Sequence, residues 1–238
     1  MSDPDLEQLK RDLVTCTRLL VMADILDYSG HLSARIPGTD HVLIQPRDAS
    51  RAALSAEDML VVDLDGNLVE GEIPPPAETA IHTGVYRNRP DAKLVCHGHP
   101  TLSTTWSMTD RTFLPMRHFA YKHPEGLAVH PDATHITTRE QGDAVAKTLG
   151  DDSACLLRAH GTVLVAPTIQ ELLMDCLDLE ENARTLLVAT QLTAGGGELR
   201  PLSAGECTEI GRSYSRSRHR PNKVWEHYVH RGTAAGIL

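Results

Sequence analysis

The chain has 238 residues, 41% of them hydrophobic and 23% charged, with a formal net charge of −9. This length and composition are typical of one globular domain that buries a sizeable core. The negative charge argues against a nucleic-acid partner, which would favour a basic face. No apolar run approaches the roughly 18 residues of a membrane span. Five scattered cysteines and the lack of a secretory signal at the start favour a cytoplasmic protein with reduced thiols.

The first third of the chain predicts one long helix followed by two strands. Apolar residues recur at steps of three and four over 5–27, which predicts a helix there. Residues 41–45 and 59–64 read as strands, and an Asp-Gly turn at 65–66 closes the second. The segment 30–33 is expected to be a loop.

The middle of the chain begins with three prolines at 74–76, which cannot sit inside a helix or a central strand. A helix is predicted over 77–88, ending before Pro90. Residues 93–97 predict a buried strand that runs directly into the tetrapeptide 97–100, His-Gly-His-Pro. A short helix can begin at its proline.

Two capping signals mark later helices, predicted over 138–150 and 168–192. Between them, residues 154–158 and 163–165 read as strands. Strands interleaved with helices, some joined by tight turns, predict a single α/β/α layered domain with a central mixed, largely antiparallel sheet. We expect this class of α/β domain to span residues 1–200.

Residues 201–238 contain little apolar periodicity. Two interpretations stay open for this segment. It is a C-terminal tail that packs on the domain or on a neighbouring subunit, or it is partly disordered.

Histidine is unusually frequent: thirteen histidines outnumber all Phe, Tyr and Trp residues combined. His97 and His99 lie two apart at the end of a predicted strand, so their side chains project to the same side. His-x-His can supply two ligands to one metal ion. Because such a pair alone also occurs in cores and on surfaces, it is a modest signal.

Two further residues strengthen this signal. His160 follows another apolar strand and precedes Gly161, so it can reach the same sheet edge as a third ligand. Glu78 stands at the start of a predicted helix and can act as a fourth ligand or as a base. Three histidines would leave positions open for water or substrate, as a catalytic site requires. His82, one helical turn after Glu78, is interpreted as a support to the site or as a core residue.

The segments 30–35, 77–86, 89–99 and 157–161, in this order and spacing, resemble the class II aldolase/adducin family. The resemblance covers roughly residues 10–195. It implies that His97, His99 and His160 bind one divalent metal ion per subunit, zinc or else manganese, iron or cobalt, and that Glu78 takes part in proton transfer. It also implies a homotetramer with active sites between subunits and a small-molecule substrate.

The chain departs from the sugar-phosphate members of the family at the expected phosphate pocket. The loop before the first predicted strand reads Gly-His-Leu-Ser, and Pro76-Ala77 stands where a Ser-Ser pair is usual. Proline has no N–H donor and alanine no hydroxyl. Arg47 offers instead a planar guanidinium group, which can donate two parallel hydrogen bonds to a carboxylate. A tyrosine that donates a proton in some family aldolases falls at Phe119.

These departures predict a substrate with a carboxylate in place of a phosphate. The chain resembles the metal-dependent aromatic-acid decarboxylases of the family more than its sugar-phosphate aldolases. The residues that we expect to contact the substrate are His31, Ser33, Arg47 and His135.

Three alternatives stay open. One is a sugar-phosphate aldolase, epimerase or dehydratase with a remodelled phosphate pocket. Another is a non-catalytic assembly domain, which the presence of all three histidines and the glutamate disfavours. The last is an iron-dependent oxygenase on the same scaffold.

Overall fold

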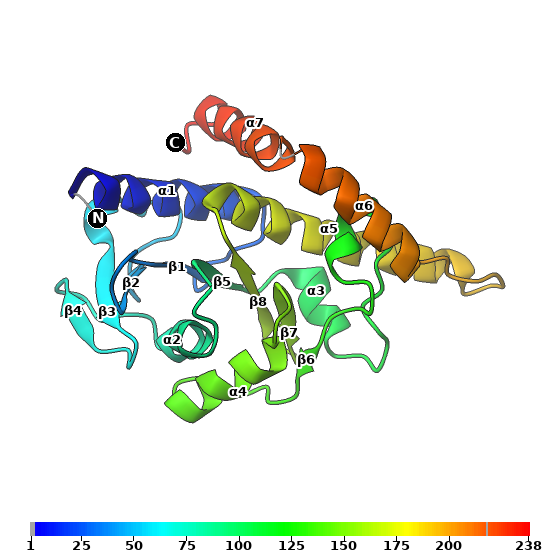
Figure 1. Ribbon diagram of the computed structural model, residues 1–238, viewed down its shortest axis with the longest axis horizontal. Coiled ribbons are helices and arrows are strands. Elements are labelled where there is room, and N and C mark those ends of the chain that lie inside the picture. The colour runs from blue at the N-terminus through cyan, green and yellow to red at the C-terminus, as the bar shows by residue number, and fades with distance from the viewer. Residues whose placement is uncertain (1–2, 218) are drawn as a thin grey trace.

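The computed structural model describes residues 3–217 and 219–238 (Figure 1). The helices are α1 (Asp3–Met22), α2 (Thr79–Asn88), α3 (Thr101–Trp106), α4 (Arg139–Leu149), α5 (Ile169–Thr193), α6 (Ala204–Ser217) and α7 (Arg220–Ala234). The strands are β1 (His31–Arg35), β2 (His41–Ile44), β3 (Leu60–Asp63), β4 (Leu68–Glu70), β5 (Leu94–Gly98), β6 (Val129–His130), β7 (Ala154–Leu157) and β8 (Gly161–Ala166). Two short 3-10 helices are η1 (Ala56–Asp58) and η2 (His118–Lys122).

The strands form one eight-stranded sheet in the order β4-β3-β2-β1-β5-β8-β7-β6. Every neighbouring pair is antiparallel except β6 and β7, which are parallel. The predicted mixed, largely antiparallel sheet is therefore confirmed. In the register of β1 and β5, His31 lies directly opposite His97. Because paired residues share a face of the sheet, these two imidazoles are neighbours.

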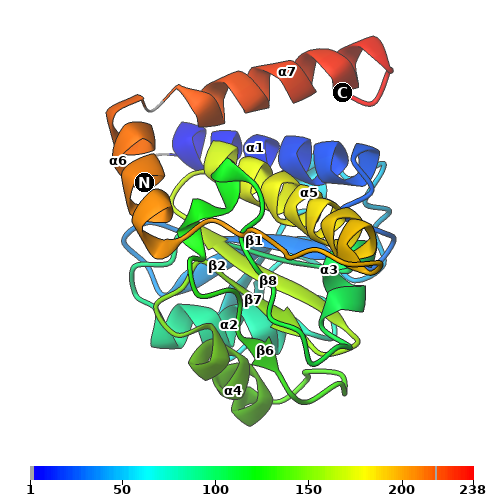
Figure 2. The ribbon, with the colours of Figure 1, turned by 90° about the vertical axis from the view of Figure 1, so that its right-hand side faces the viewer.

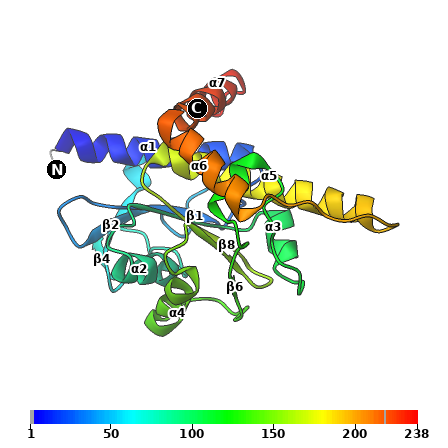
Figure 3. The same cartoon turned by 45° about the vertical axis from the view of Figure 1, so that its right-hand side comes forward.

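Helices cover both faces of the sheet. Figures 2 and 3 show α1 and α5 on one face, α2 and α4 on the other, and α7 outside α1. Apolar side chains fill both interlayer spaces, for example Leu20 and Leu172 under α1 and α5, and Ile81 and Val145 under α2 and α4. The predicted α/β/α layering is confirmed.

The first helix ends earlier than predicted, at Met22. Asp24 adopts a φ of 57°, in the left-handed region, where a regular helix cannot continue. Ile25 and Leu26 then turn into the core and are only 5% and 4% exposed. Their apolar character extended the sequence pattern beyond the true end of the helix.

The expectation of a loop over residues 30–33 is wrong, because β1 begins at His31. Leu32 and Ala34 face one layer of the core, as in an ordinary strand. His31 and Ser33 face the other side and are also buried, at 3% and 0% exposure. A strand buried on both faces normally reads as an apolar run, so these two polar residues concealed it.

The segment after residue 200 folds as two helices, α6 and α7, despite its weak periodicity. Trp225, Tyr228 and Val229 of α7 pack against the core cluster that α1 and α5 share. The guanidinium of Arg18 on α1 donates to the carbonyl oxygen of Ile237 at 3.1 Å. Few apolar residues make these contacts, which explains why the helical period was missed. No helix among the described residues is long and apolar enough to span a membrane.

Candidate metal centre

Four side chains from separate parts of the chain converge beside the ends of β5 and β8. One ligand atom from each of Glu78, His97, His99 and His160 lies within 4.8 Å of all the others. Glu78 immediately precedes α2, the first two histidines stand at the end of β5, and His160 lies in the turn before β8. The adjacent pairing of β5 and β8 brings these segments together.

Acceptor groups fix the orientation of two of the imidazoles. Nδ1 of His97 lies 3.0 Å from the carbonyl oxygen of Thr162, and Nδ1 of His99 lies 3.2 Å from Oδ2 of Asp27. A carbonyl or carboxylate oxygen only accepts, so each imidazole donates from Nδ1. Both Nε2 atoms then present lone pairs. Partners that orient histidines in this way are typical of metal sites.

The geometry fits a divalent cation. Nε2 of His97 and Nε2 of His99 lie 3.1 Å apart, and two lone pairs at this distance repel unless a cation lies between them. Two nitrogen ligands of a tetrahedral zinc ion at 2.0–2.1 Å are about 3.3 Å apart. Oε2 of Glu78 lies in the same range, at 3.3 Å from Nε2 of His160 and 3.6 Å from Nε2 of His97.

A tight turn presents His160. Ala159, just before it, has a φ of 56°, which is unusual for a residue with a Cβ atom. The N–H of Ala159 donates to Oγ of Ser107 at 3.0 Å, which holds this strained turn. A Cβ atom on Gly161 would collide with the carbonyl oxygen of Gly98. The glycine after His160 is therefore needed for β8 to pass so close to β5.

Glu78 is held at both carboxylate oxygens. Oε1 accepts a hydrogen bond from the N–H of Ile136 at 2.9 Å, and Oε2 faces His160 and His97. Burial opposes ionisation of Glu78, but the neighbouring imidazoles of His160 and His97 and the N–H of Ile136 outweigh it and hold the pKa of Glu78 well below its ordinary value. Its place before the first turn of α2 also favours a negative charge.

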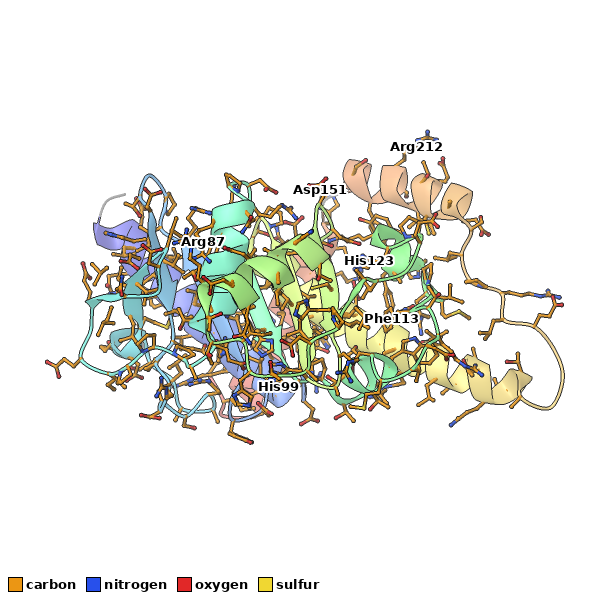
Figure 4. All side chains as sticks on the ribbon, turned by 90° about the horizontal axis from the view of Figure 1, so that it is seen from below. Arg87, His99, Phe113, His123, Asp151 and Arg212 are labelled. Atoms are coloured by element: carbon orange, nitrogen blue, oxygen red, sulfur yellow. The ribbon has the colours of Figure 1, made fainter. Side chains whose placement is uncertain are left out.

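Two of the predicted substrate residues lie beside the cluster. The ring centroid of His31 is 5.1 Å from that of His97, and the exposed His135 stacks at 6.1 Å from His160. Figure 4 shows His99 at the opposite margin of the view from Arg212 of α6, so α6 does not reach the cluster within one chain. Substrate contact by His31 and His135 stays a prediction.

Ser33 does not have the position expected of a substrate contact. Its side chain is completely buried, and its hydroxyl is bonded to Nδ1 of His82 at 2.6 Å and to the hydroxyl of Tyr86 at 2.9 Å. A hydroxyl engaged in this way has no access to a ligand. Direct substrate binding by Ser33 is therefore corrected to a supporting position behind His31.

Arg47 lies outside the four-residue cluster. Its exposed side chain lines a groove of about 170 Å³ that it shares with Pro76, Ala77 and Arg139. This groove borders the beginning of α2, next to Glu78. A role of Arg47 in binding a remote part of the substrate stays a prediction.

Sequence reasoning missed the supporting residues Asp27 and Arg51. Arg51 is only 3% exposed, and its guanidinium donates to the carbonyl oxygens of Gly30, Pro46 and Ala49 at 2.8, 2.8 and 2.6 Å. These bonds fix the backbone just before His31. Sequence alone does not predict these roles, because Asp27 meets His99 and Arg51 meets Gly30 only in the folded chain.

The chain is similar in sequence to a known family and to curated proteins. A family model described as the Class II Aldolase and Adducin N-terminal domain matches residues 11–187. The chain is 28% identical to a 3,4-dihydroxyphthalate decarboxylase of Arthrobacter keyseri, over 87% of this chain and 86% of that protein. It is 27% identical to a 3-oxo-tetronate 4-phosphate decarboxylase of Escherichia coli, over 76% and 84% of the two chains.

A solved structure shares the fold. The L-fuculose 1-phosphate aldolase of Glaciozyma antarctica superimposes with a TM-score of 0.83 at 19% identity, covering 97% of this chain and 92% of the other. At that identity the likeness concerns the fold. Because the family model spans most of the sequence, the assignment follows: the chain belongs to the class II aldolase and adducin N-terminal domain family.

Proposed function

We propose that the protein is a metal-dependent carbon–carbon lyase that decarboxylates a non-phosphorylated, hydroxylated aromatic carboxylic acid. The observation that carries this proposal is the convergence of three imidazoles and the Glu78 carboxylate around one point. Membership of the family supports it, as do the two relatives named above, both of which are decarboxylases.

The residues of the cluster have distinct roles in this proposal. His97, His99 and His160 would hold the ion, which supplies a Lewis acid for negative charge that develops on a substrate oxygen. Three imidazoles and a carboxylate suit zinc, manganese, iron or cobalt. The more exposed side chain of His99, at 20%, marks the side from which a substrate can approach.

Glu78 is proposed to move the proton. Its Oε1 is anchored by Ile136, so Oε2 can accept the proton of a substrate hydroxyl. When the carbon–carbon bond breaks, carbon dioxide departs and the electron pair of that bond stays on the substrate carbon. Glu78 then returns its proton to this carbon, and water restores the hydroxyl proton.

The groove that contains Arg47 supports a substrate without phosphate. Pro76 has no N–H and Ala77 has no hydroxyl, so these two positions offer no donor to a phosphate dianion, and the donors of the groove are side chains such as Arg47, Arg139 and Thr137. The guanidinium of Arg47 offers a fork that matches a second carboxylate. The relative named as a 3,4-dihydroxyphthalate decarboxylase acts on an aromatic dicarboxylate, which agrees with this chemistry.

A second candidate is a sugar-phosphate decarboxylase, aldolase or epimerase. It is favoured by the relative named as a 3-oxo-tetronate 4-phosphate decarboxylase, whose substrate carries a phosphate. The two candidates differ in the group that the groove beside α2 must bind.

Carbon dioxide release from a panel of hydroxybenzoates, hydroxyphthalates and sugar-acid phosphates distinguishes the candidates. The expected result is metal-dependent release from an aromatic acid, abolished by chelation and by Glu78→Gln. Turnover of phosphorylated sugars alone would establish the second candidate and refute the first.

Family membership also motivates a proposal for assembly and location. We propose a cytoplasmic homotetramer in which active sites lie between subunits. Light scattering coupled to size-exclusion chromatography tests the assembly directly, with a mass of four chains expected and a monomer contradicting it.

A further inference from the structure

A buried chain of polar side chains leads from the core to His31. The hydroxyl of Tyr86 lies 2.9 Å from Oγ of Ser33, which lies 2.6 Å from Nδ1 of His82. Nε2 of His82 then lies 2.7 Å from Nδ1 of His31. All four side chains are at most 3% exposed, so these groups bond mainly to one another.

The regular geometry of two elements creates this chain. His31 and Ser33 are two apart on β1, and His82 and Tyr86 are four apart on α2. Residues at these spacings share one face of a strand and one face of a helix. Two residues of β1 are thus hydrogen-bonded to two residues of α2.

The hydroxyl at the far end sets the direction of the hydrogen bonds. The hydroxyl of Tyr86 can donate to Oγ of Ser33 at 2.9 Å or to the carbonyl oxygen of Lys93 at 3.4 Å. With Ser33, the closer acceptor, receiving this bond, Ser33 donates its own proton to Nδ1 of His82. His82 then donates from Nε2 to Nδ1 of His31. The remaining proton of the neutral His31 is therefore on Nε2.

The edge of the His31 ring that carries Nε2 is the one available to a ligand. Nδ1 faces α2, whereas Nε2 has no hydrogen-bond partner among the described residues and is not one of their fully buried unpaired atoms. The ring lies beside the ring of His97, opposite it in the register of β1 and β5. We propose that Tyr86, Ser33 and His82 are positioning residues that hold the Nε2–H of His31 as a hydrogen-bond donor to a substrate oxygen. The substrate's place there rests on the proposed function.

Nitrogen-15 NMR of the zinc-loaded protein, without substrate, tests this chain of hydrogen bonds independently of turnover. The expected spectrum shows His31 protonated at Nε2 in the wild type. In Ser33→Ala a mixture of tautomers is expected, because His82 loses the donor that fixes it. Tyr86→Phe, which keeps the ring, is a second variant and should shift the same signals less. The matched control is Ser103→Ala, which removes another buried hydroxyl, bonded to Glu180 at 2.6 Å.

Kinetics then show whether the hydrogen-bonded residues Tyr86, Ser33 and His82 act through His31. We expect kcat of Ser33→Ala to fall about tenfold at unchanged zinc content, as for a slightly misplaced reacting group. Ser33→Thr, which keeps a hydroxyl, should recover most of the loss, and Ser103→Ala should not lower kcat. Protonation of wild-type His31 at Nδ1, or a Ser33→Ala spectrum and kcat equal to wild type, would overturn the proposal. If the wild type turns over no acid, the proposed function fails. The NMR result still decides whether Tyr86, Ser33 and His82 fix the proton of His31 on Nε2.

Discussion

Oδ2 of Asp27 lies 3.2 Å from Nδ1 of His99, on the edge of the ring that faces away from the other imidazoles. The N–H groups of Ser29 and Gly30 donate to the same carboxylate at 2.8 and 3.0 Å. Burial opposes the charge of Asp27, but these N–H groups and His99 outweigh it and hold its pKa below the ordinary value. Asp27 is thus an anionic partner that orients a candidate metal ligand.

Replacing Asp27 by asparagine should weaken metal binding about 10- to 100-fold, the usual effect of losing such a partner. Competition with a chromophoric chelator measures the affinity. Asp132→Asn is the matched control, because Asp132 makes the same kind of turn with Thr134 but contacts no imidazole of the cluster. Equal losses in both variants would contradict the assigned role.

Metal should stabilise the folded protein. An ion that binds only the native state raises the free energy of unfolding by about 2.7 kcal/mol at a free concentration 100 times its Kd. Urea unfolding with and without zinc measures this difference. The gain should vanish in His97→Ala and persist in His227→Ala, which alters an exposed histidine on α7. Equal stabilisation of both variants would show that zinc binds elsewhere.

Stability should fall with acidity through His82. Burial, aided by the nearby His97, lowers the pKa of His82 from its ordinary 6.5 to about 3. The unfolded chain therefore binds more protons than the folded one between these values, so stability is full above pH 6.5 and is lost as the pH falls toward 3. The loss through this residue approaches roughly 1 kcal/mol per pH unit within the window.

Urea unfolding of the metal-free protein at several pH values tests this dependence. His82→Gln should show a shallower decline between pH 6.5 and 4.5 than the wild type, whereas His227→Gln should follow the wild type. Parallel curves for all three proteins would refute the assignment to His82.

The close packing of α2 on α4 should be sensitive to a single methyl group. A Cβ atom on Gly142 would overlap the carbonyl oxygen of Ala80, so the two helices must separate in Gly142→Ala. We expect a loss of about 1–3 kcal/mol in the free energy of unfolding. Metal affinity should also fall, because Glu78 precedes α2. Gly195→Ala, where no described atom lies within 4 Å, serves as control. Unchanged stability of Gly142→Ala would show that the helices adapt freely.

The sequence was sufficient for features with a local pattern. The spacing of His97 and His99 after an apolar strand, and of His160 before Gly161, led directly to the cluster. The contacts that support it were not predictable, because Asp27 meets His99 72 residues later and Ser33 meets His82 49 residues later. The polar residues of β1 even concealed the strand, since their hydrogen bonds to α2 exist only in the folded chain.

The central claim is that one cation is bound jointly by imidazoles distant in sequence. Anomalous diffraction at the zinc edge, from crystals of zinc-loaded protein, tests it most directly. We predict a single strong peak with Nε2 of His97, His99 and His160 at about 2.0–2.1 Å. A peak elsewhere, or one that persists at the same occupancy in crystals of His160→Ala, would contradict the account.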